Sequence, residues 1–172
     1  MKELTPPGSY IVADDIGSDV AVQGGEVIVG ARYDDNGGTM NAGSALLFDV
    51  VTGTFVRPLL PGPTVLVSAE SGTAVDVDGG LAVLGAPHDF GASGVLGTAW
   101  LHDIATGSLI AELQPANPAP PERFANDVAI NITHKVAHVF TLHFANAIAI
   151  DVTNNLTHNV AFNITHDISD YV

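Results

Sequence analysis

The sequence contains no cysteine. This absence excludes disulfide bonds, thiol nucleophiles and zinc sites built on thiolates, so the fold must be stabilised by packing. Basic residues are scarce, because Lys and Arg number 5 against 19 Asp and Glu, which gives a formal net charge of −14. A chain this acidic repels a phosphate backbone and an anionic membrane surface, so neither is expected as a partner. Cations are the favoured ligands, although acidic loops also simply keep a β-rich surface soluble.

The sequence also lacks long apolar runs and signatures of catalysis. No 18 apolar residues stand together, so it predicts no membrane span. The amino terminus MKELTPPGSYIVADD has no apolar core of the kind found in signal peptides. Two explanations stay open: the chain remains in the cytoplasm, or it is a mature or excerpted part of a longer protein. No Gly-Lys phosphate loop and no Ser nucleophile elbow occur, so no enzyme is predicted.

What the sequence does contain is many short apolar segments separated by turns. Its 172 residues are 47% hydrophobic and 14% charged, with 18 Gly and 10 Pro. This composition is typical of a folded chain with frequent turns, and the length suits one domain over residues 1–172.

An internal repeat is the most informative feature. Residues of the first unit recur 55 positions later in the second, as Gly17 and Gly72, Val20 and Val75, Val22 and Val77, Gly30 and Gly85, and Ala31 and Ala86. Each unit has four short segments rich in β-branched or aromatic residues: DVAVQ, EVIVGA, SALLFDV and TFVRPLL, then TAVDV, LAVLGA, TAWLHDI and SLIAELQ. Gly24-Gly25 and Gly79-Gly80 predict tight hairpins. Each unit therefore reads as an antiparallel meander.

The predicted fold class is all-β, a partial β-propeller of four-stranded antiparallel blades, because such meanders bury their faces only against neighbouring sheets. Pro-rich joints separate the units. We expect blades at about residues 16–60, 71–114 and 122–156 and a partial fourth at 157–172. The third unit is eroded, since its Gly-Gly hairpin is replaced and its acidic loop is missing.

The first unit, IGSDVAVQGGEVIVGARYDDNGGTMNAGSALLFDVVTG, resembles the FG-GAP repeat of integrin α-subunit propellers and of many bacterial surface and secreted proteins. In that family an aromatic-Gly pair opens the blade, Gly-Ala-Pro follows the second strand, and an acidic loop often binds calcium. The corresponding residues here are Ile16-Gly17, Ser71-Gly72 and Phe124-Ala125, then Gly30-Ala31-Arg32 and Gly85-Ala86-Pro87. The resemblance implies a propeller, an extracellular or cell-surface location, and ligand binding or adhesion without catalysis.

Propellers close with about four to eight blades, and the sequence offers fewer. An open stack exposes the apolar faces of its outer blades. The sequence therefore predicts either homo-oligomers that close the ring or an origin as part of a longer chain.

The loop RYDDNGGTMNAG is the best candidate for a calcium site, because Gly-rich acidic loops offer both carboxylates and backbone carbonyls. The predicted metal ligands are Asp34, Asp35, Asn36, Asn41 and, in the corresponding loop of the second unit, Asp89. Gly38 and Ala42 stand where the family pattern has oxygen ligands, so we expect weak binding. An ordinary solvated loop is the alternative.

Two other groups of polar residues have simpler explanations. Asp49 and Asp103 precede Thr-Gly turns, where an Asp caps backbone N–H groups, so we do not interpret them as catalytic. Five of the seven His lie in the last third, namely His134, His138, His143, His158 and His166. Alternation places the first two on one strand face, but without Cys or a neighbouring acid a titrating or surface cluster is favoured over a metal site.

Together these features favour a non-enzymatic FG-GAP-type module that binds a protein or glycan and is stabilised by calcium. The alternatives are an accessory propeller domain of a secreted hydrolase and a truncated reading frame without selected function.

Overall fold

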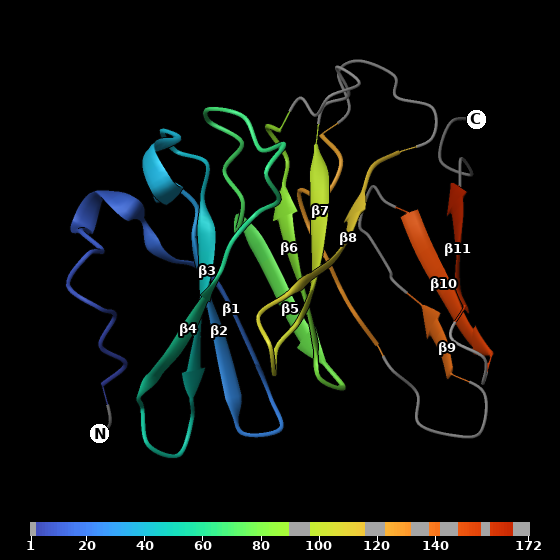
Figure 1. Cartoon of the computed structure of the whole chain (residues 1–172), viewed down its shortest axis with the longest axis horizontal. Coiled ribbons are helices and arrows are strands. Elements are labelled where there is room, and N and C mark those ends of the chain that lie inside the picture. Colours follow the sequence, from blue (N-terminus) through green and yellow to red (C-terminus); the bar gives the residue numbers. More distant parts are fainter. Residues whose placement is uncertain are drawn as a thin grey trace, which may run out of the picture.

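The computed structural model describes residues 3–89, 97–115, 123–131, 138–141, 148–155 and 159–166. In these residues the fold is all-β, with two four-stranded antiparallel sheets, one three-stranded sheet and two short 3-10 turns, as Figure 1 shows. The prediction of an all-β fold made of four-stranded antiparallel blades is thereby confirmed, although the sheets do not close into a ring.

Each of the two repeat units forms one complete sheet whose strands follow chain order. The first sheet consists of β1 (Ile16–Gln23), β2 (Glu26–Ala31), β3 (Ser44–Asp49) and β4 (Phe55–Leu59). The second consists of β5 (Ala74–Asp78), β6 (Leu81–Ala86), β7 (Thr98–Asp103) and β8 (Leu109–Leu113). The registers are equivalent, since Val20 pairs with Val29 in one sheet as Val75 pairs with Leu84 in the other.

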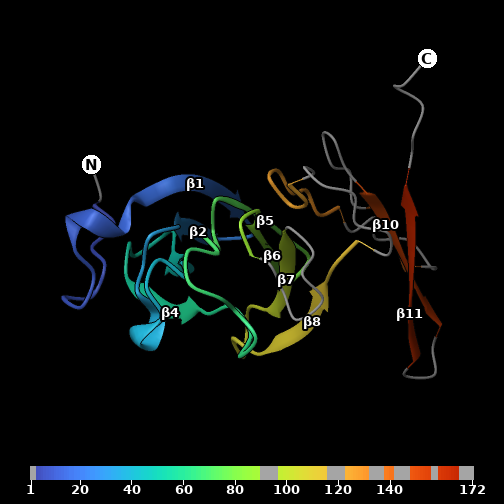
Figure 2. The same ribbon diagram turned by 90° about the horizontal axis from the view of Figure 1, so that it is seen from above.

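The two sheets stack face to face. One buried cluster joins Ile28, Ala45 and Leu47 of the first sheet to Leu84 and Trp100 of the second. Figures 1 and 2 show the same arrangement, with β1 beside β5 and with β4 and β8 at the opposite edges of their sheets. The equivalent sheets therefore bury their facing sides against each other, as propeller blades do.

Irregular chain packs on part of each outward face of this pair. Leu4 and Tyr10 pack on Val27, Val29 and other residues on the outer face of the first sheet. On the outer face of the second sheet, the described segment 123–131 contributes four apolar residues, namely Phe124, Ala125, Val128 and Ile130. Segment 123–131, predicted as the entry to a third blade, therefore packs on the second sheet without forming a strand.

Close backbone contacts between successive units explain two of the repeated glycines. A Cβ at Gly30 would overlap the carbonyl oxygen of Gly72, and a Cβ at Gly85 would overlap that of Ala125. Only Gly permits this approach, so the Gly of the Gly-Ala motif is a packing requirement.

An Asp side chain accepts a backbone hydrogen bond across each of the two unit boundaries, although the two Asp residues are not at equivalent repeat positions. Asp19 Oδ2 accepts from the backbone N–H of Val75 at 2.8 Å, and Asp76 Oδ2 accepts from that of Ile130 at 2.7 Å. The boundary between the second unit and segment 123–131 thus resembles the boundary between the first two units.

The third sheet differs from the predicted division of the C-terminal region. It consists of β9 (His138–Thr141), β10 (Ile148–Asn155) and β11 (Asn159–His166), in the order β11-β10-β9. The sequence predicts that these residues belong partly to a third blade and partly to the start of a fourth. In the structure, β10 and β11 pair along their whole length. A connection as short as that between Asn155 and Asn159 favours antiparallel pairing of consecutive strands.

Candidate functional site

The longer connections of the two blades lie at one end of the sheets. The β2–β3 loop, residues 32–43, and the joint between β4 and β5, residues 60–73, both lie at the upper end in Figure 1. We call this end the loop end. The opposite end holds the Gly24-Gly25 and Gly79-Gly80 hairpins, whose glycines all have positive φ. Variable chemistry in such a fold is carried by the longer loops on a rigid scaffold.

Both blades begin their β2–β3 type loop with an anchored Asp. The N–H of Asp34 donates to Ala31 O at 3.1 Å, and its carbonyl accepts from Gly43 at 2.9 Å. Asp89 repeats this arrangement with Ala86 O and the N–H of Gly97, and its side chain is completely buried. The backbone of this Asp therefore closes the base of the loop in each blade.

The Asp34 carboxylate lies in a half-buried acidic environment. Its Oδ2 accepts from the Ser44 hydroxyl at 2.6 Å. Burial raises the pKa of Asp34, and the nearby charges of Asp14 and Asp35 raise it further, while the bond from Ser44 opposes the rise. Burial likewise raises the pKa of Tyr10, which also bonds Ser44. Negative charge is thus concentrated where a cation would relieve it.

The other predicted ligands lie in the same loop, except for Asp89. Asp35 Oδ1 accepts from the backbone N–H of Asn41 at 2.9 Å, and Asn36 begins the 3-10 turn η2 (Asn36–Gly38). Asp89 occupies the position equivalent to Asp34 in the second blade, so it belongs to a separate loop. Within the part of the chain that is described, no three His, Asp or Glu side chains are grouped as metal ligands. A calcium site here would use Asn and backbone oxygens beside the two carboxylates.

Backbone hydrogen bonds fasten the acidic loop to the joint between the blades. Ser68 N donates to Met40 O at 2.9 Å, Glu70 N to Asn41 O at 3.1 Å, and Ser71 N to Ala42 O at 2.9 Å. Asn41, Ser68 and Glu70 have φ of 50°, 60° and 58°. Non-Gly residues in this conformation are uncommon and are held there by surrounding contacts. The two segments therefore form one rigid platform.

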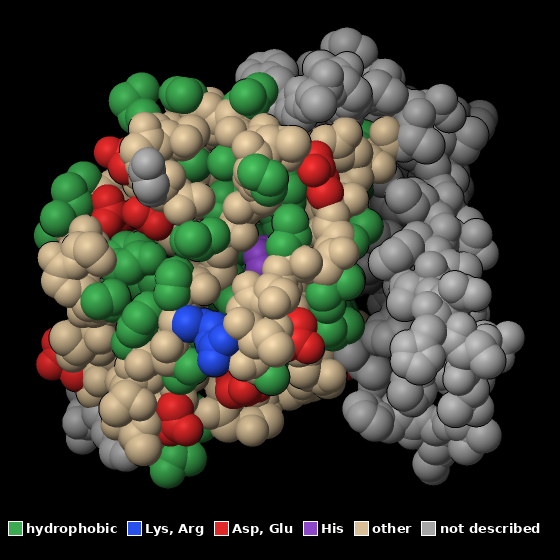
Figure 3. All heavy atoms as spheres, viewed as in Figure 1, with side chains coloured by type: hydrophobic (Ala, Val, Ile, Leu, Met, Phe, Trp, Pro, Cys, Tyr) green, Lys and Arg blue, Asp and Glu red, His purple; other side chains and the backbone are tan. Residues whose placement is uncertain are grey.

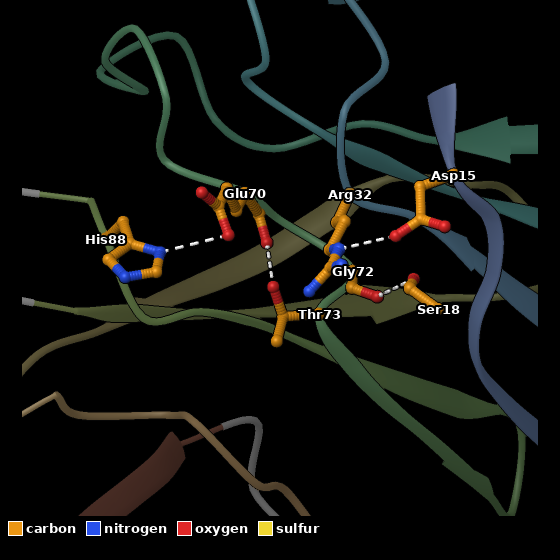
Figure 4. A network of polar contacts seen from close by, with 7 residues as sticks. All are labelled: Asp15, Ser18, Arg32, Glu70, Gly72, Thr73 and His88. Carbon is orange, nitrogen blue, oxygen red and sulfur yellow. Dashed lines mark hydrogen bonds and ion pairs between the residues drawn. The ribbon is translucent and has the colours of Figure 1, made fainter. Parts of the chain in front are cut away.

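A network of polar side chains extends this platform across both blades, as Figure 4 shows. Arg32 Nε donates to Asp15 Oδ2 at 2.6 Å, and His88 Nδ1 lies 3.0 Å from Glu70 Oε2. Ser18 Oγ donates to Gly72 O at 2.8 Å. These residues come from β1 and the residue before it, the β2–β3 loop, the joint and the second blade. Their polar contacts therefore connect the two blades at the loop end.

Apolar side chains project from the same platform. Met40, Leu66 and Val67 are 56%, 42% and 55% exposed. The bond from Ser68 N to Met40 O places Met40 beside the chain that follows Val67, and a bond from Ala69 N to Leu66 O at 3.3 Å turns the segment that carries Leu66 and Val67. We call them the apolar patch. The sequence alone did not predict this patch. Its residues stand in the segments LVSAE and GTMNA, and the exposure of their side chains depends on how the joint folds.

The Thr-Gly turns at the opposite end match their prediction. Asp49 Oδ1 accepts from Thr52 N at 2.7 Å, and Asp103 Oδ1 accepts from Thr106 N at 2.8 Å. The bond from the Thr106 backbone, followed by that from its hydroxyl, lowers the pKa of Asp103. These carboxylates cap turns.

Of the five histidines of the C-terminal region, His138 begins β9 and His166 ends β11, on opposite sides of β10. The other three, His134, His143 and His158, lie outside the described residues.

The fold defines an all-β protein of stacked, repeated sheets. No protein-family model matches the chain, and no curated protein matches it in sequence. No helix in the described ranges is long and apolar enough to cross a membrane.

Proposed function

We propose that the chain is a non-enzymatic FG-GAP-type β-propeller module, extracellular or at the cell surface, that binds a protein or glycan through its loop end. The observation that carries this proposal is the repeated unit boundary, in which Gly30 and Gly72 contact each other as Gly85 and Ala125 do. The β2–β3 loop and the joint lie side by side next to that boundary, at one end of the sheets. Because the other end of the stacked sheets has only short turns, the loops are the surface where residues can change without disturbing the sheets.

The loop end is suited to recognition because it is held rigid before any ligand binds. Its strained backbone, at Asn41, Ser68 and Glu70, is fixed by hydrogen bonds to neighbouring segments. Preorganisation of this kind reduces the entropy lost on binding.

Calcium bound beside Asp34 and Asp35 is part of the same proposal. The charge of Asp34 is disfavoured by burial and by two neighbouring carboxylates. A divalent cation there would neutralise that charge and add ligand bonds within the loop next to the apolar patch.

The proposal is tested by titrating the purified chain against panels of immobilised glycans and extracellular proteins, followed by hydrogen exchange with each ligand that binds. We expect saturable binding and slower exchange at residues 36–43 and 66–71. The hairpins Gly24-Gly25 and Gly79-Gly80 serve as internal controls and should be unaffected. Absence of saturable binding, or protection only at the hairpin end, would contradict the proposed function.

A further inference from the structure

We infer that the apolar patch of Met40, Leu66 and Val67 docks a basic polypeptide segment that carries apolar side chains. This inference rests on the proposed function and specifies the chemistry of the ligand.

The apolar patch is exposed on an ordered support. Aliphatic and thioether side chains that stay exposed on an ordered loop lose water contact only when a partner covers them. Met40 accepts from Ser68 in the backbone pairing between the two loops, and Leu66 and Val67 directly precede Ser68 in the chain. Burying such a row beneath a partner is favourable and needs no reordering of the loop.

Acidic residues lie next to the patch in both segments that carry it. Asp35 bonds the N–H of Asn41, next to Met40, and Asp34 precedes it in the chain. Glu70 lies in the joint, three residues after Val67, and its N–H donates to Asn41 O. Figure 3 shows hydrophobic side chains along the upper edge of the molecule and acidic side chains directly below them.

Two cations of the loop end are already engaged. Arg32 pairs with Asp15, and His88 lies beside Glu70. An acidic rim around an apolar centre is complementary to a segment in which Arg or Lys flanks apolar residues.

The same surface is less suited to a glycan. Met, Leu and Val side chains offer no hydrogen-bonding groups to sugar hydroxyls, and an acidic rim gives no preference for a neutral sugar. An apolar side chain of a peptide, by contrast, gains from contact with them.

The experiment uses fluorescein-labelled peptides titrated onto the full chain in the presence of a calcium chelator. The probes are a short peptide of alternating Arg and Leu, a peptide of alternating Arg and Ser with the same charge, and one of alternating Glu and Leu. We expect the Arg-Leu peptide to bind at least about tenfold more tightly than the Arg-Ser peptide, because only the former fills the apolar patch. The Glu-Leu peptide should not bind. Equal affinity for the two Arg peptides would overturn the inference, since charge alone would then explain binding.

Variants locate the contact. Met40→Ser with Val67→Ser should weaken binding of the Arg-Leu peptide by about tenfold, while Val56→Ser with Ile110→Ser should change it less than about twofold. The control residues are similarly exposed and lie on β4 and β8. Loss of affinity in both pairs would show diffuse apolar binding and would overturn the inference.

The outcomes separate the inference from the proposed function. A chain that binds a glycan or another protein at the loop end but not the Arg-Leu peptide disproves only the inference. If the patch variants bind every ligand as the wild type does, and hydrogen exchange at the loop end is not slowed, both the inference and the proposed function are disproved.

Discussion

At the scale of single residues, His102 is a buried titratable group that links the second blade to the joint. Its Nε2 lies 2.9 Å from Leu60 O, and its side chain is almost completely inaccessible. Burial lowers the pKa of His102, against the weaker opposing effect of carbonyl contacts. The folded protein therefore holds this residue neutral, with Nε2–H donating to Leu60.

The pH dependence of stability follows from that lowered pKa. The unfolded chain takes up a proton near the ordinary His pKa of about 6.5, while folded His102 resists protonation. The contribution of neutral His102 to the free energy of unfolding is therefore fully present above about pH 6.5. It declines as the pH falls below that value toward the pKa of the folded state, by at most about 1.4 kcal/mol per pH unit. Urea unfolding of wild type and His102→Gln between pH 8 and pH 5 measures this. The variant keeps a donor for Leu60 and should lose stability less steeply; parallel curves would contradict the account.

Asp34 is the residue on which the calcium proposal depends. Calcium should raise the melting temperature of the wild type, and Asp34→Asn should abolish that rise, because one carboxylate of the loop is lost. Thermal melts with calcium and with a chelator give the result.

Asp103→Asn is the matched control for Asp34→Asn. It removes a carboxylate from a turn at the opposite end, so it should lower the melting temperature but keep the calcium response. A calcium response that persists in Asp34→Asn, or that is missing from the wild type, would reject the site.

The roles of the turn-capping residues were predictable from the sequence, whereas the exposed apolar patch was not. Asp49 and Asp103 were identified as turn caps because their partners Thr52 and Thr106 are three residues away. The apolar patch depends instead on hydrogen bonds between segments distant in the chain, such as Ser68 to Met40. Hydrophobicity alone predicts burial, so its exposure could not be foreseen.

At the scale of the elements, the two blades were predictable because pattern and turn chemistry agree. All eight strands lie where alternation and Gly, Asp or Pro boundaries placed them. The third sheet has the order β11-β10-β9, and the residues that formed hairpins in the first units are replaced there. Segment 123–131 retains the boundary contacts, through Ala125 and Ile130, without forming a strand.

The boundary between blades gives a prediction about glycine. Gly30→Ala should destabilise the fold by about 1 to 3 kcal/mol, because the new methyl would overlap the Gly72 carbonyl and force the blades apart. Gly8→Ala is the control, since nothing lies within 4 Å of its added Cβ. Chemical denaturation gives both values. A Gly30→Ala variant as stable as Gly8→Ala would show that the blades do not approach this closely.

At the scale of the whole molecule, the first blade has an uncovered row on its outer face. Val20 and Val22 are 51% and 61% exposed, whereas the equivalent Val75 and Val77 are each 4% exposed beneath β1. Val20 and Val22 pair with Val29 and Val27, so they share the outer face.

We expect copies of the chain to associate through this row. Light scattering over a concentration series should show a mass above that of the monomer, and Val20→Thr with Val22→Thr should reduce it. Val56→Thr on β4 provides the control. A wild type that stays monomeric at every concentration would rule out the association.

The central claim is that the first two sheets share one core and fold as a unit. Trp100, the single Trp, lies in that core on the second blade, and Leu47 belongs to the same core from the first blade. Urea unfolding of Leu47→Ala, followed by Trp100 fluorescence and by far-ultraviolet circular dichroism, tests the claim, with exposed Val56→Ala as control. The account predicts that both signals shift together, by about 2 to 4 kcal/mol, although the change lies in the other blade. A Trp100 transition that stays at the wild-type urea concentration would contradict it.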